Sequence, residues 1–160
     1  NKYPFKIIPD ELGKIKFEIE LERKTRQFYP EEIVAMLLKK LITDAEIYLN
    51  KKVEKVFISI PAFFNSNQRQ AIMDAAKLID LDVFRLMSDT LAAAFTYFFT
   101  KENRRKELLL VVDIGGGTTD ISLIKFENWI IEMISSSGRI NFGGNTFDDQ
   151  LLNYTLKFLN

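Results

Sequence analysis

The segment with the clearest chemical potential reads VVDIGGGTTDIS and covers residues 111–122. Its three consecutive glycines are Gly115, Gly116 and Gly117. Because glycine has no Cβ and permits positive φ, three successive backbone amides could approach an anion here. Asp113 and Asp120 bracket the glycines together with Thr118, and carboxylates at such a turn bind Mg²⁺ through its waters or a monovalent cation. The segment therefore predicts a phosphate site with a cation beside it.

Extended segments flank the glycines on both sides. The apolar run at residues 108–112 predicts a strand that is buried on both faces and central in a sheet, and Ile121 and Leu123 resume an extended pattern. We therefore expect a strand, a turn and a strand, because no helix and no Gly-Lys-Ser/Thr follows as in a Walker loop. The alternative is a tight hairpin that uses glycine only to turn. Two-residue hairpins, however, need one or two glycines rather than three.

Composition limits the remaining chemistry. The chain has 160 residues, 47% of them hydrophobic, and a formal net charge of zero, which predicts one sizeable core and no nucleic-acid surface. The densest basic run, residues 101–106, predicts a solvated loop. The chain contains neither Cys nor His, which excludes disulfides, thiolate and ordinary zinc sites, and Ser-His-Asp or Cys-His catalysis. Any catalysis or ligand binding must therefore use carboxylates, hydroxyls, backbone amides, Lys and Arg.

The sequence carries no signal for a membrane. No apolar run approaches the ~18 residues of a membrane span, and the opening NKYPFKIIPD lacks a signal-peptide core. We therefore expect a cytoplasmic protein without membrane partners. The first residue is Asn, which leaves open whether localisation signals precede it.

Strands and helices are predicted to alternate along the chain. Periodicity predicts strands at residues 14–21, 56–60, 83–87 and 129–134, the last after a turn at 127–128. A helix is predicted from Pro30 to about residue 50, with an apolar stripe formed by Ile33, Leu37, Leu41 and Tyr48. Two further helices are predicted to begin at the caps Asn65 and Asp89, and a last one near Thr146. This order predicts a layered α/β fold with an added β-hairpin.

Several segments resemble one family in the same order. They are YPFKII at 3–8, FYPEEI at 28–33, IPAFFNSNQRQAIMDAA at 60–76, LAAAFTY at 91–97, DIGGGTTDIS at 113–122 and FGGNTFDDQLLN at 142–153. With these motifs the chain resembles the central part of the nucleotide-binding domain of the 70-kDa heat-shock (DnaK-type) chaperones, in the actin/hexokinase ATPase superfamily. The resemblance implies part of an actin-like, ribonuclease H-like α/β fold.

The resemblance also implies roles for the glycine segment. Gly115, Gly116, Gly117 and Thr118 would wrap the β and γ phosphates of ATP. Asp113 would orient magnesium-bound water, and Asp120 would bind a cation such as K⁺. The implied cofactors are therefore ATP or ADP, Mg²⁺ and K⁺.

Three further residues match regulatory positions of the family. Pro61 matches a proline switch and Arg69 a relay arginine, which together report the nucleotide state to the peptide-binding domain. Arg85 matches an arginine that helps to engage J-domain co-chaperones. The simpler alternatives are a proline that ends a strand and two solubilising charges.

The chain also departs from the family pattern. Where the family has Asn-Glu-Pro-Thr, this chain has Ser88, Asp89, Thr90 and Leu91, so the catalytic glutamate near the attacking water becomes the shorter Asp89. A displacement of ~1 Å in a catalytic group costs on the order of a hundredfold in rate. Other departures are Asn145-Thr146 for Glu-Asp, Thr119 for phenylalanine and Phe63 for tyrosine. We expect these changes to affect hydrolysis more than binding.

The resemblance divides the chain into parts of one incomplete nucleotide-binding domain. Residues 1–28 would end the upper subdomain of the first lobe, and residues 29–106 would form its lower subdomain. Residues 107–141 would begin the lower subdomain of the second lobe, and residues 142–160 its upper subdomain. The family's first phosphate loop, adenosine-binding segment and peptide-binding domain have no match here. We therefore expect the isolated chain to bind ATP poorly and to be inactive.

The resemblance implies that the full-length parent is an ATP-dependent chaperone and an ATPase, which captures and releases unfolded polypeptides. Its partners would be unfolded clients, bound through an absent domain, with J-domain co-chaperones and nucleotide-exchange factors. The alternative from another class is a non-hydrolysing regulatory or interaction protein on the same fold. A sugar kinase of the superfamily is a third reading, but the matches outside the hairpin are chaperone-like.

Overall fold

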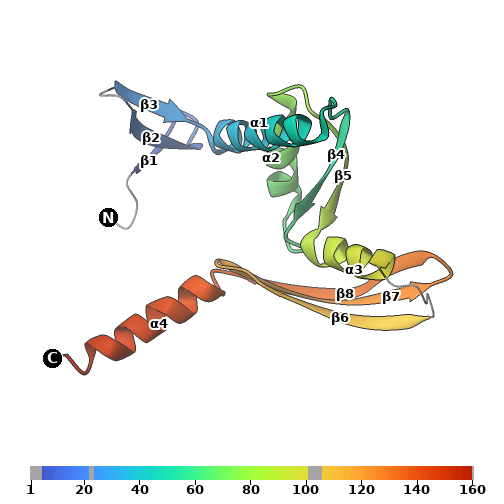
Figure 1. Cartoon of the computed structure of the whole chain (residues 1–160). Helices are drawn as coiled ribbons and strands as arrows, with labels where there is room; N and C mark the ends of the chain where they lie inside the picture. The colour runs from blue at the N-terminus through green and yellow to red at the C-terminus, as the bar shows by residue number, and fades with distance from the viewer. Residues whose placement is uncertain (1–4, 22–23, 101–105, 160) are drawn as a thin grey trace. The chain divides into compact units, whose positions relative to one another are not determined.

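The computed structural model describes residues 5–21, 24–100 and 106–159, so most of the basic run predicted as a loop lies outside the described residues (Figure 1). The elements are β1 (Lys6–Pro9), β2 (Ile15–Leu21), β3 (Lys24–Phe28), α1 (Pro30–Leu49), β4 (Lys55–Ile60), α2 (Ser66–Lys77), β5 (Asp82–Ser88), α3 (Asp89–Thr100), β6 (Glu107–Ile114), β7 (Thr118–Glu127), β8 (Ile130–Ile140) and α4 (Gly144–Leu156). The strands form sheets of order β1-β2-β3, β4-β5 and β6-β7-β8. The mixed α/β prediction is confirmed.

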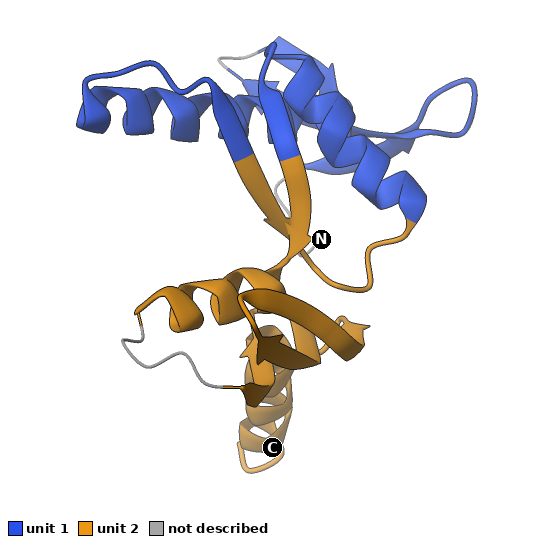
Figure 2. Cartoon of the chain, turned by 90° about the vertical axis from the view of Figure 1, so that its right-hand side faces the viewer, with its two compact units in different colours: residues 1–56, 66–84 blue, residues 57–65, 85–160 orange. Residues whose placement is uncertain are grey.

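The chain divides into two compact units. Unit 1 comprises residues 1–56 and 66–84, and unit 2 comprises residues 57–65 and 85–160 (Figure 2). The division passes through both β4 and β5, as the colour change along these strands shows. The four subdomains expected from the resemblance are a different division and stay a prediction.

In unit 1, the β1–β2 hairpin is anchored by one carboxylate. The Asp10 Oδ1 atom accepts hydrogen bonds from the backbone N–H groups of Leu12 (2.9 Å) and Lys14 (2.8 Å), and Gly13 supplies the positive φ of 78°. The Tyr29 hydroxyl donates to Asp10 Oδ2 at 2.9 Å. Burial by itself would raise the pKa of Asp10, but these hydrogen bonds together outweigh it and lower the pKa. Asp10 therefore ties the hairpin to the residue that precedes α1.

Helices α1 and α2 pack on each other through small side chains. The buried residues of the pair are Ala35 in α1 and Ala75 and Ala76 in α2. The stripe predicted for α1 is wrong, because Leu37 and Leu41 are 59% and 55% exposed. Periodicity identifies an apolar helix, whereas the position of its neighbour decides which apolar face is covered.

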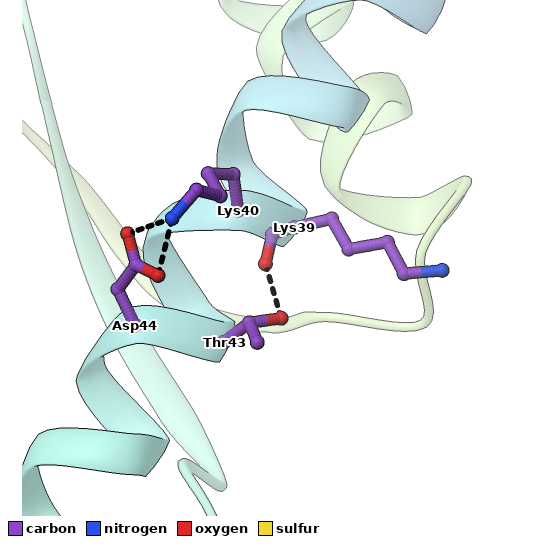
Figure 3. A network of polar contacts seen from close by, with 4 residues as sticks. All are labelled: Lys39, Lys40, Thr43 and Asp44. Atoms are coloured by element: carbon purple, nitrogen blue, oxygen red, sulfur yellow. Dashed lines mark hydrogen bonds and ion pairs between the residues drawn. The ribbon is translucent and has the colours of Figure 1, made fainter.

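Part of the polar face of α1 carries contacts within the helix. Lys40 and Asp44 form an ion pair one turn apart, and the Thr43 hydroxyl donates to the Lys39 carbonyl at 2.8 Å (Figure 3). An exposed pair of this kind contributes about 0.3–0.5 kcal/mol. We interpret these charges as a solvated helix surface.

In unit 2, α3 covers one face of the β6–β7–β8 sheet. The residues of β7 that face the interior alternate along the strand and are Asp120, Ser122, Ile124 and Phe126. The buried residues of α3 recur every four positions and are Thr90, Ala94 and Phe98. The rings of Phe98 and Phe126 stack with centroids 4.3 Å apart. The interface is therefore apolar at one end of β7 and polar at the end nearest the glycines.

The prediction that residues 108–112 are buried on both faces is wrong for the described residues. Leu109 and Val111 pack against the core, but Leu108 and Leu110 are each 64% exposed. In the described part of the chain, β6 is an edge strand that pairs only with β7. Strand β6 carries apolar side chains on both of its faces, but α3 covers only one of these faces.

Candidate functional site

The three glycines form the turn between β6 and β7. The antiparallel register pairs Asp113 with Asp120 and Ile114 with Thr119. The Gly115 N–H donates to the Thr118 carbonyl at 2.9 Å and closes the turn. The predicted strand, turn and strand is confirmed.

The protein itself does not require glycine at these three positions. None of the three has φ in the left-handed region. A Cβ at Gly115 or Gly116 would come no closer than 3.6 or 3.8 Å to another atom, and at Gly117 it would meet nothing within 4 Å. Neither turn conformation nor packing among the described residues therefore explains the glycines. Open space over the turn suits a ligand that approaches the backbone.

Two of the three amides are available to such a ligand. The Gly115 N–H is used within the turn, so the expectation of three free amides is reduced to two. Across the residues that the structure describes, the N–H groups of Gly116 and Gly117 donate no hydrogen bond. Adjacent unpaired amides of this kind favour an anion.

The carbonyl groups of the same turn are all occupied. Gly144 N–H donates to the Gly115 carbonyl at 2.9 Å, Asn145 N–H to that of Gly116 at 2.8 Å, and Phe142 N–H to that of Gly117 at 3.2 Å. The residues at the start of α4 therefore bind the carbonyl oxygens of the glycine turn. They leave the N–H groups of Gly116 and Gly117 available.

Gly143 makes this approach between turn and helix possible. A Cβ at Gly143 would lie 2.4 Å from the Gly115 carbonyl oxygen and 2.9 Å from that of Gly116. Because both atoms belong to the backbone, they cannot move aside as a side chain would. The sequence analysis missed this contact.

Asp120 is the most buried of the predicted site carboxylates, with 2% of its surface exposed. Burial raises the pKa of Asp120, the hydrogen bond from Ala62 N–H to its Oδ1 atom (3.1 Å) opposes this, and the nearby carboxylates of Asp89 and Asp113 raise it further. The fold thus brings three predicted site carboxylates close enough to interact. No group of three or more His, Cys, Asp or Glu side chains arranged to hold a metal ion occurs in the described ranges.

The segment after Pro61 packs beside Asp120. Asp120 pairs in register with Gly138 of β8, and a Cβ at Gly138 would lie 2.4 Å from a ring atom of Phe63 and 2.8 Å from Asp120 Oδ1. The sequence analysis missed Gly138, although a glycine inside a strand often indicates a close approach. Pro61 follows β4 directly, as predicted.

The start of α3 differs from the prediction. The Ser88 Oγ atom accepts a hydrogen bond from Leu91 N–H at 3.3 Å, so Ser88 caps the helix. Asp89 is the first helical residue, and its predicted role as the cap is wrong. The Thr90 hydroxyl lies 2.7 Å from the Ser122 hydroxyl of β7.

Two other departures from the family pattern make structural bonds. The Thr119 hydroxyl donates to the Phe142 carbonyl at 2.8 Å. The Thr146 hydroxyl donates to the Asn141 carbonyl at 3.2 Å and accepts from Gly143 N–H at 3.4 Å. Both hydroxyls therefore support the start of α4 beside the glycine turn.

The two predicted regulatory arginines lie in different units. Arg69 is partly buried in α2 of unit 1. Arg85 is exposed on β5 in unit 2, where it borders a pocket of about 290 Å³. The pocket is mostly apolar and is lined by Arg85, Met87, Leu91, Phe95, Phe98, Phe99, Phe126, Trp129 and Ile131.

None of the helices that the structure describes is both long and apolar enough to cross a membrane.

Comparison with known proteins places the chain in one family. The family model "Hsp70 protein" matches residues 1–160. "Chaperone protein dnaK" of Trieres chinensis is 40% identical over 157 residues, which is 98% of this chain and 25% of that protein. "Heat shock 70 kDa protein" of Neurospora crassa is 40% identical over 152 residues, 95% of this chain and 23% of that protein. The chain thus spans about a quarter of the length of these relatives.

The family match and the mixed α/β architecture together confirm the fold class. The described residues hold part of the actin-like ATPase fold, with the glycine turn between two of its strands. The chain belongs to the Hsp70 protein family.

Proposed function

We propose that the full-length protein is an ATP-dependent chaperone that binds and hydrolyses ATP to drive the capture and release of unfolded polypeptides. This chain supplies one phosphate-binding hairpin of its nucleotide-binding domain. The observation that carries the proposal is the glycine turn, which has two unpaired amides and no internal need for glycine. Family membership and relatives named as chaperones support it.

The phosphate oxygens are held by the N–H groups of Gly116 and Gly117 and by the Thr118 hydroxyl. Backbone amides suit this task because they are fixed donors that need no reorganisation when charge develops on the phosphate. The start of α4 supports the turn from its carbonyl side.

The carboxylates of the site fit a cation bound partly through water. Asp113 is exposed, and Asp120 keeps one oxygen, Oδ2, that accepts no hydrogen bond from the described residues. Asp113 would hold Mg²⁺ through its waters and Asp120 would hold K⁺. When bound, such cations neutralise phosphate charge during in-line attack by water. Asp89, at the start of α3, would orient the attacking water.

The isolated chain is expected to bind ATP weakly. Two charge-assisted hydrogen bonds contribute roughly 1.5–3 kcal/mol each, whereas association costs ~4–15 kcal/mol. The site therefore needs further contacts from the rest of a nucleotide-binding domain, within which residues 1–28, 29–106, 107–141 and 142–160 belong to successive subdomains.

Partners are assigned by the same reasoning. Arg85 is exposed beside the apolar pocket of unit 2, a combination that fits a co-chaperone of the J-domain type. Pro61 and Arg69 would report the nucleotide state to a peptide-binding domain, which holds the unfolded client. Nucleotide-exchange factors complete the cycle.

The alternative function is a regulatory or interaction protein that binds nucleotide without hydrolysing it. The observation that favours it is the position of Asp89, whose side chain is one methylene shorter than the glutamate expected there. Replacement of Asp89 by Glu distinguishes the two: a large gain in hydrolysis from a near-inactive wild type supports the alternative.

The test of the main proposal measures ATP binding and hydrolysis by the full-length protein. The paired variant Gly116→Ala/Gly117→Ala is expected to weaken ATP binding, because two Cβ atoms would keep phosphate away from the amides. Gly144→Ala is the matched control, since its amide is already bonded and its Cβ would meet no atom closer than 3.7 Å. Equal ATP affinity in all three proteins would contradict the proposal.

The isolated chain provides a second measurement. Its thermal unfolding with and without millimolar Mg-ATP reports whether the hairpin binds nucleotide by itself. We expect no shift of the transition. A clear rise with ATP would mean that the site is more self-sufficient than the energies above indicate.

A further inference from the structure

Helix α3 is held on strand β7 at two points with different chemistry. At the far end from the glycines, the Phe98 ring stacks on Phe126 with centroids 4.3 Å apart. At the near end, the hydroxyls of Thr90 and Ser122 are 2.7 Å apart. Stacked rings still allow small sliding movements, whereas a short hydrogen bond fixes distance and direction.

The hydroxyl pair is fully enclosed. Thr90 is 0% exposed and Ser122 is 1% exposed, so neither hydroxyl can exchange its partner for solvent. The Ser88 hydroxyl, which caps α3, lies 3.4 Å from that of Thr90 and extends the polar contact to the end of β5. Buried polar groups strongly favour the arrangement in which each is satisfied, because an unpaired one is costly.

The position of this pair connects the parts of the candidate site. Thr90 directly follows Asp89, and Ser122 lies two residues from Asp120 on the strand that leaves the glycine turn. The two segments are 32 residues apart in sequence. A single buried hydrogen bond thus links the helix turn that carries Asp89 to the strand that carries Asp120.

We propose that Thr90 is a positioning residue for the phosphate site, which acts through its hydrogen bond to Ser122 to fix Asp89 relative to the glycine turn. The inference rests on the proposed function, because Asp89 matters only if a water attacks a phosphate there. Loss of the bond frees the first turn of α3 to shift, and Asp89 shifts with it. The phosphate-binding amides of Gly116 and Gly117 are held separately, by the start of α4. Hydrolysis therefore depends on Thr90 more than nucleotide affinity does.

The test compares three variants in the full-length protein. Thr90→Val removes the hydroxyl at nearly constant volume, and Thr90→Ser retains it. Thr96→Val is the matched control on the same helix, because the Thr96 hydroxyl donates only to the Ala92 carbonyl, at 3.1 Å, and is exposed. The measured quantities are the single-turnover hydrolysis rate and the dissociation constant of ATP.

We expect Thr90→Val to lower the hydrolysis rate by about ten- to a hundredfold, the range of a misplaced catalytic group. Its ATP dissociation constant should stay near the wild-type value, Thr90→Ser should recover most of the rate, and Thr96→Val should change neither quantity. A wild-type rate in Thr90→Val, or an equal loss in Thr90→Ser, would overturn the inference. So would a loss of rate that is matched by an equal loss of affinity.

A second readout separates this inference from the proposed function. If the wild type hydrolyses no ATP, the proposed function fails, and hydrogen exchange of the Leu91 amide still reports the tether. Thr90→Val should speed that exchange by about two- to tenfold, the effect of one net hydrogen bond. Thr90→Ser should not speed it, and Thr90→Val should add nothing in a Ser122→Ala background. Unchanged exchange in Thr90→Val would show that the pair does not hold the helix.

Discussion

The two turns that bound β7 reverse the usual relation between glycine and conformation. The β6–β7 turn contains Gly115, Gly116 and Gly117, yet none of them has a left-handed φ. The β7–β8 turn contains no glycine, yet Asn128 and Trp129 have φ values of 51° and 67°. Two successive left-handed residues are the geometry of a type I′ hairpin, which glycine normally favours.

This contrast shows that a glycine in this protein is not always kept for its backbone conformation. In the β7–β8 turn the chain tolerates left-handed residues without glycine. In the β6–β7 turn it keeps glycine where neither dihedral angles nor neighbouring atoms demand it. Gly138 and Gly143 represent a further reason, because a Cβ at either would collide with protein atoms. The absence of side chains at residues 115–117 is therefore not explained by conformation or by packing among the described residues, which supports the proposed phosphate site.

The largest expected effect comes from a glycine that packing requires. Gly143→Ala would place a Cβ 2.4 Å from the Gly115 carbonyl oxygen. Overpacking against backbone should lower the free energy of unfolding by about 1–3 kcal/mol. Urea unfolding of the chain, followed by fluorescence of its single tryptophan, Trp129, measures this. Gly144→Ala, with no contact closer than 3.7 Å, is the control. Equal stability of the two variants would mean that packing does not require glycine at position 143.

The next effect tests the turn without glycine. Asn128→Ala should destabilise the hairpin by about 1–2 kcal/mol, because alanine is disfavoured at φ of 51° whereas asparagine tolerates it. Asn128→Gly should be at least as stable as the wild type. The same urea experiment measures both variants. If alanine is accepted without loss, left-handed strain does not limit this turn.

A pH-dependent effect is expected at Asp120. Its pKa is raised in the folded state above the ordinary value of 3.8, chiefly by burial. The stability that this carboxyl contributes is thus full below pH 3.8 and is lost as pH rises through the raised folded pKa. Asp120→Asn stays neutral and keeps an oxygen for Ala62 N–H, so it should be more stable than the wild type at pH 7.

This advantage of Asp120→Asn should shrink as pH falls toward 3.8. Urea unfolding at a series of pH values gives the difference between the two proteins. Asp113→Asn, at the residue paired with Asp120, removes one of the charges that raise the pKa of Asp120, so it should reduce the stability that the protein loses through Asp120 as pH rises. A stability difference that does not vary with pH would mean that Asp120 is already ionised without cost.

The smallest effect on stability is expected within the glycine turn. Gly117→Ala meets no atom within 4 Å and needs no left-handed φ, so it should stabilise the fold by about 0.4–1 kcal/mol by restricting the unfolded chain. A stable Gly117→Ala protein that binds ATP more weakly would sharpen the contrast between the two turns. A destabilised Gly117→Ala protein would mean that the turn itself requires glycine at this position.

Local patterns predicted local structure well. The helix begins at Pro30 and the strand before Pro61 ends at Ile60, because proline lacks the N–H that a helix interior or a central strand needs. The turn predicted at residues 127–128 is observed at Asn128 and Trp129, one residue later. The cap of α3 was assigned to Asp89 instead of Ser88, since both residue types cap helices and only the Leu91 bond distinguishes them.

Burial was predicted less well, because it depends on neighbours that periodicity does not name. The stripe assigned to α1 included Leu37 and Leu41, which are exposed, while the buried residue is Ala35. From the resemblance alone, the departure Ser88-Asp89-Thr90-Leu91 is expected to lie near the attacking water. The structure adds that its hydroxyls form a buried contact with Ser122.

The sequence by itself determined the order of strands and helices from α1 to α4, the glycine turn between two strands, the absence of Cys and His chemistry, and the family. It did not predict β1 or β3. These follow from residue type and short-range spacing. Only the tertiary structure decided which turn amides stay unpaired, and that Asp120 is buried against Ala62, 58 residues away. It alone decided that Thr90 bonds to Ser122. The physical reason is that each of these properties depends on a partner atom brought close by folding.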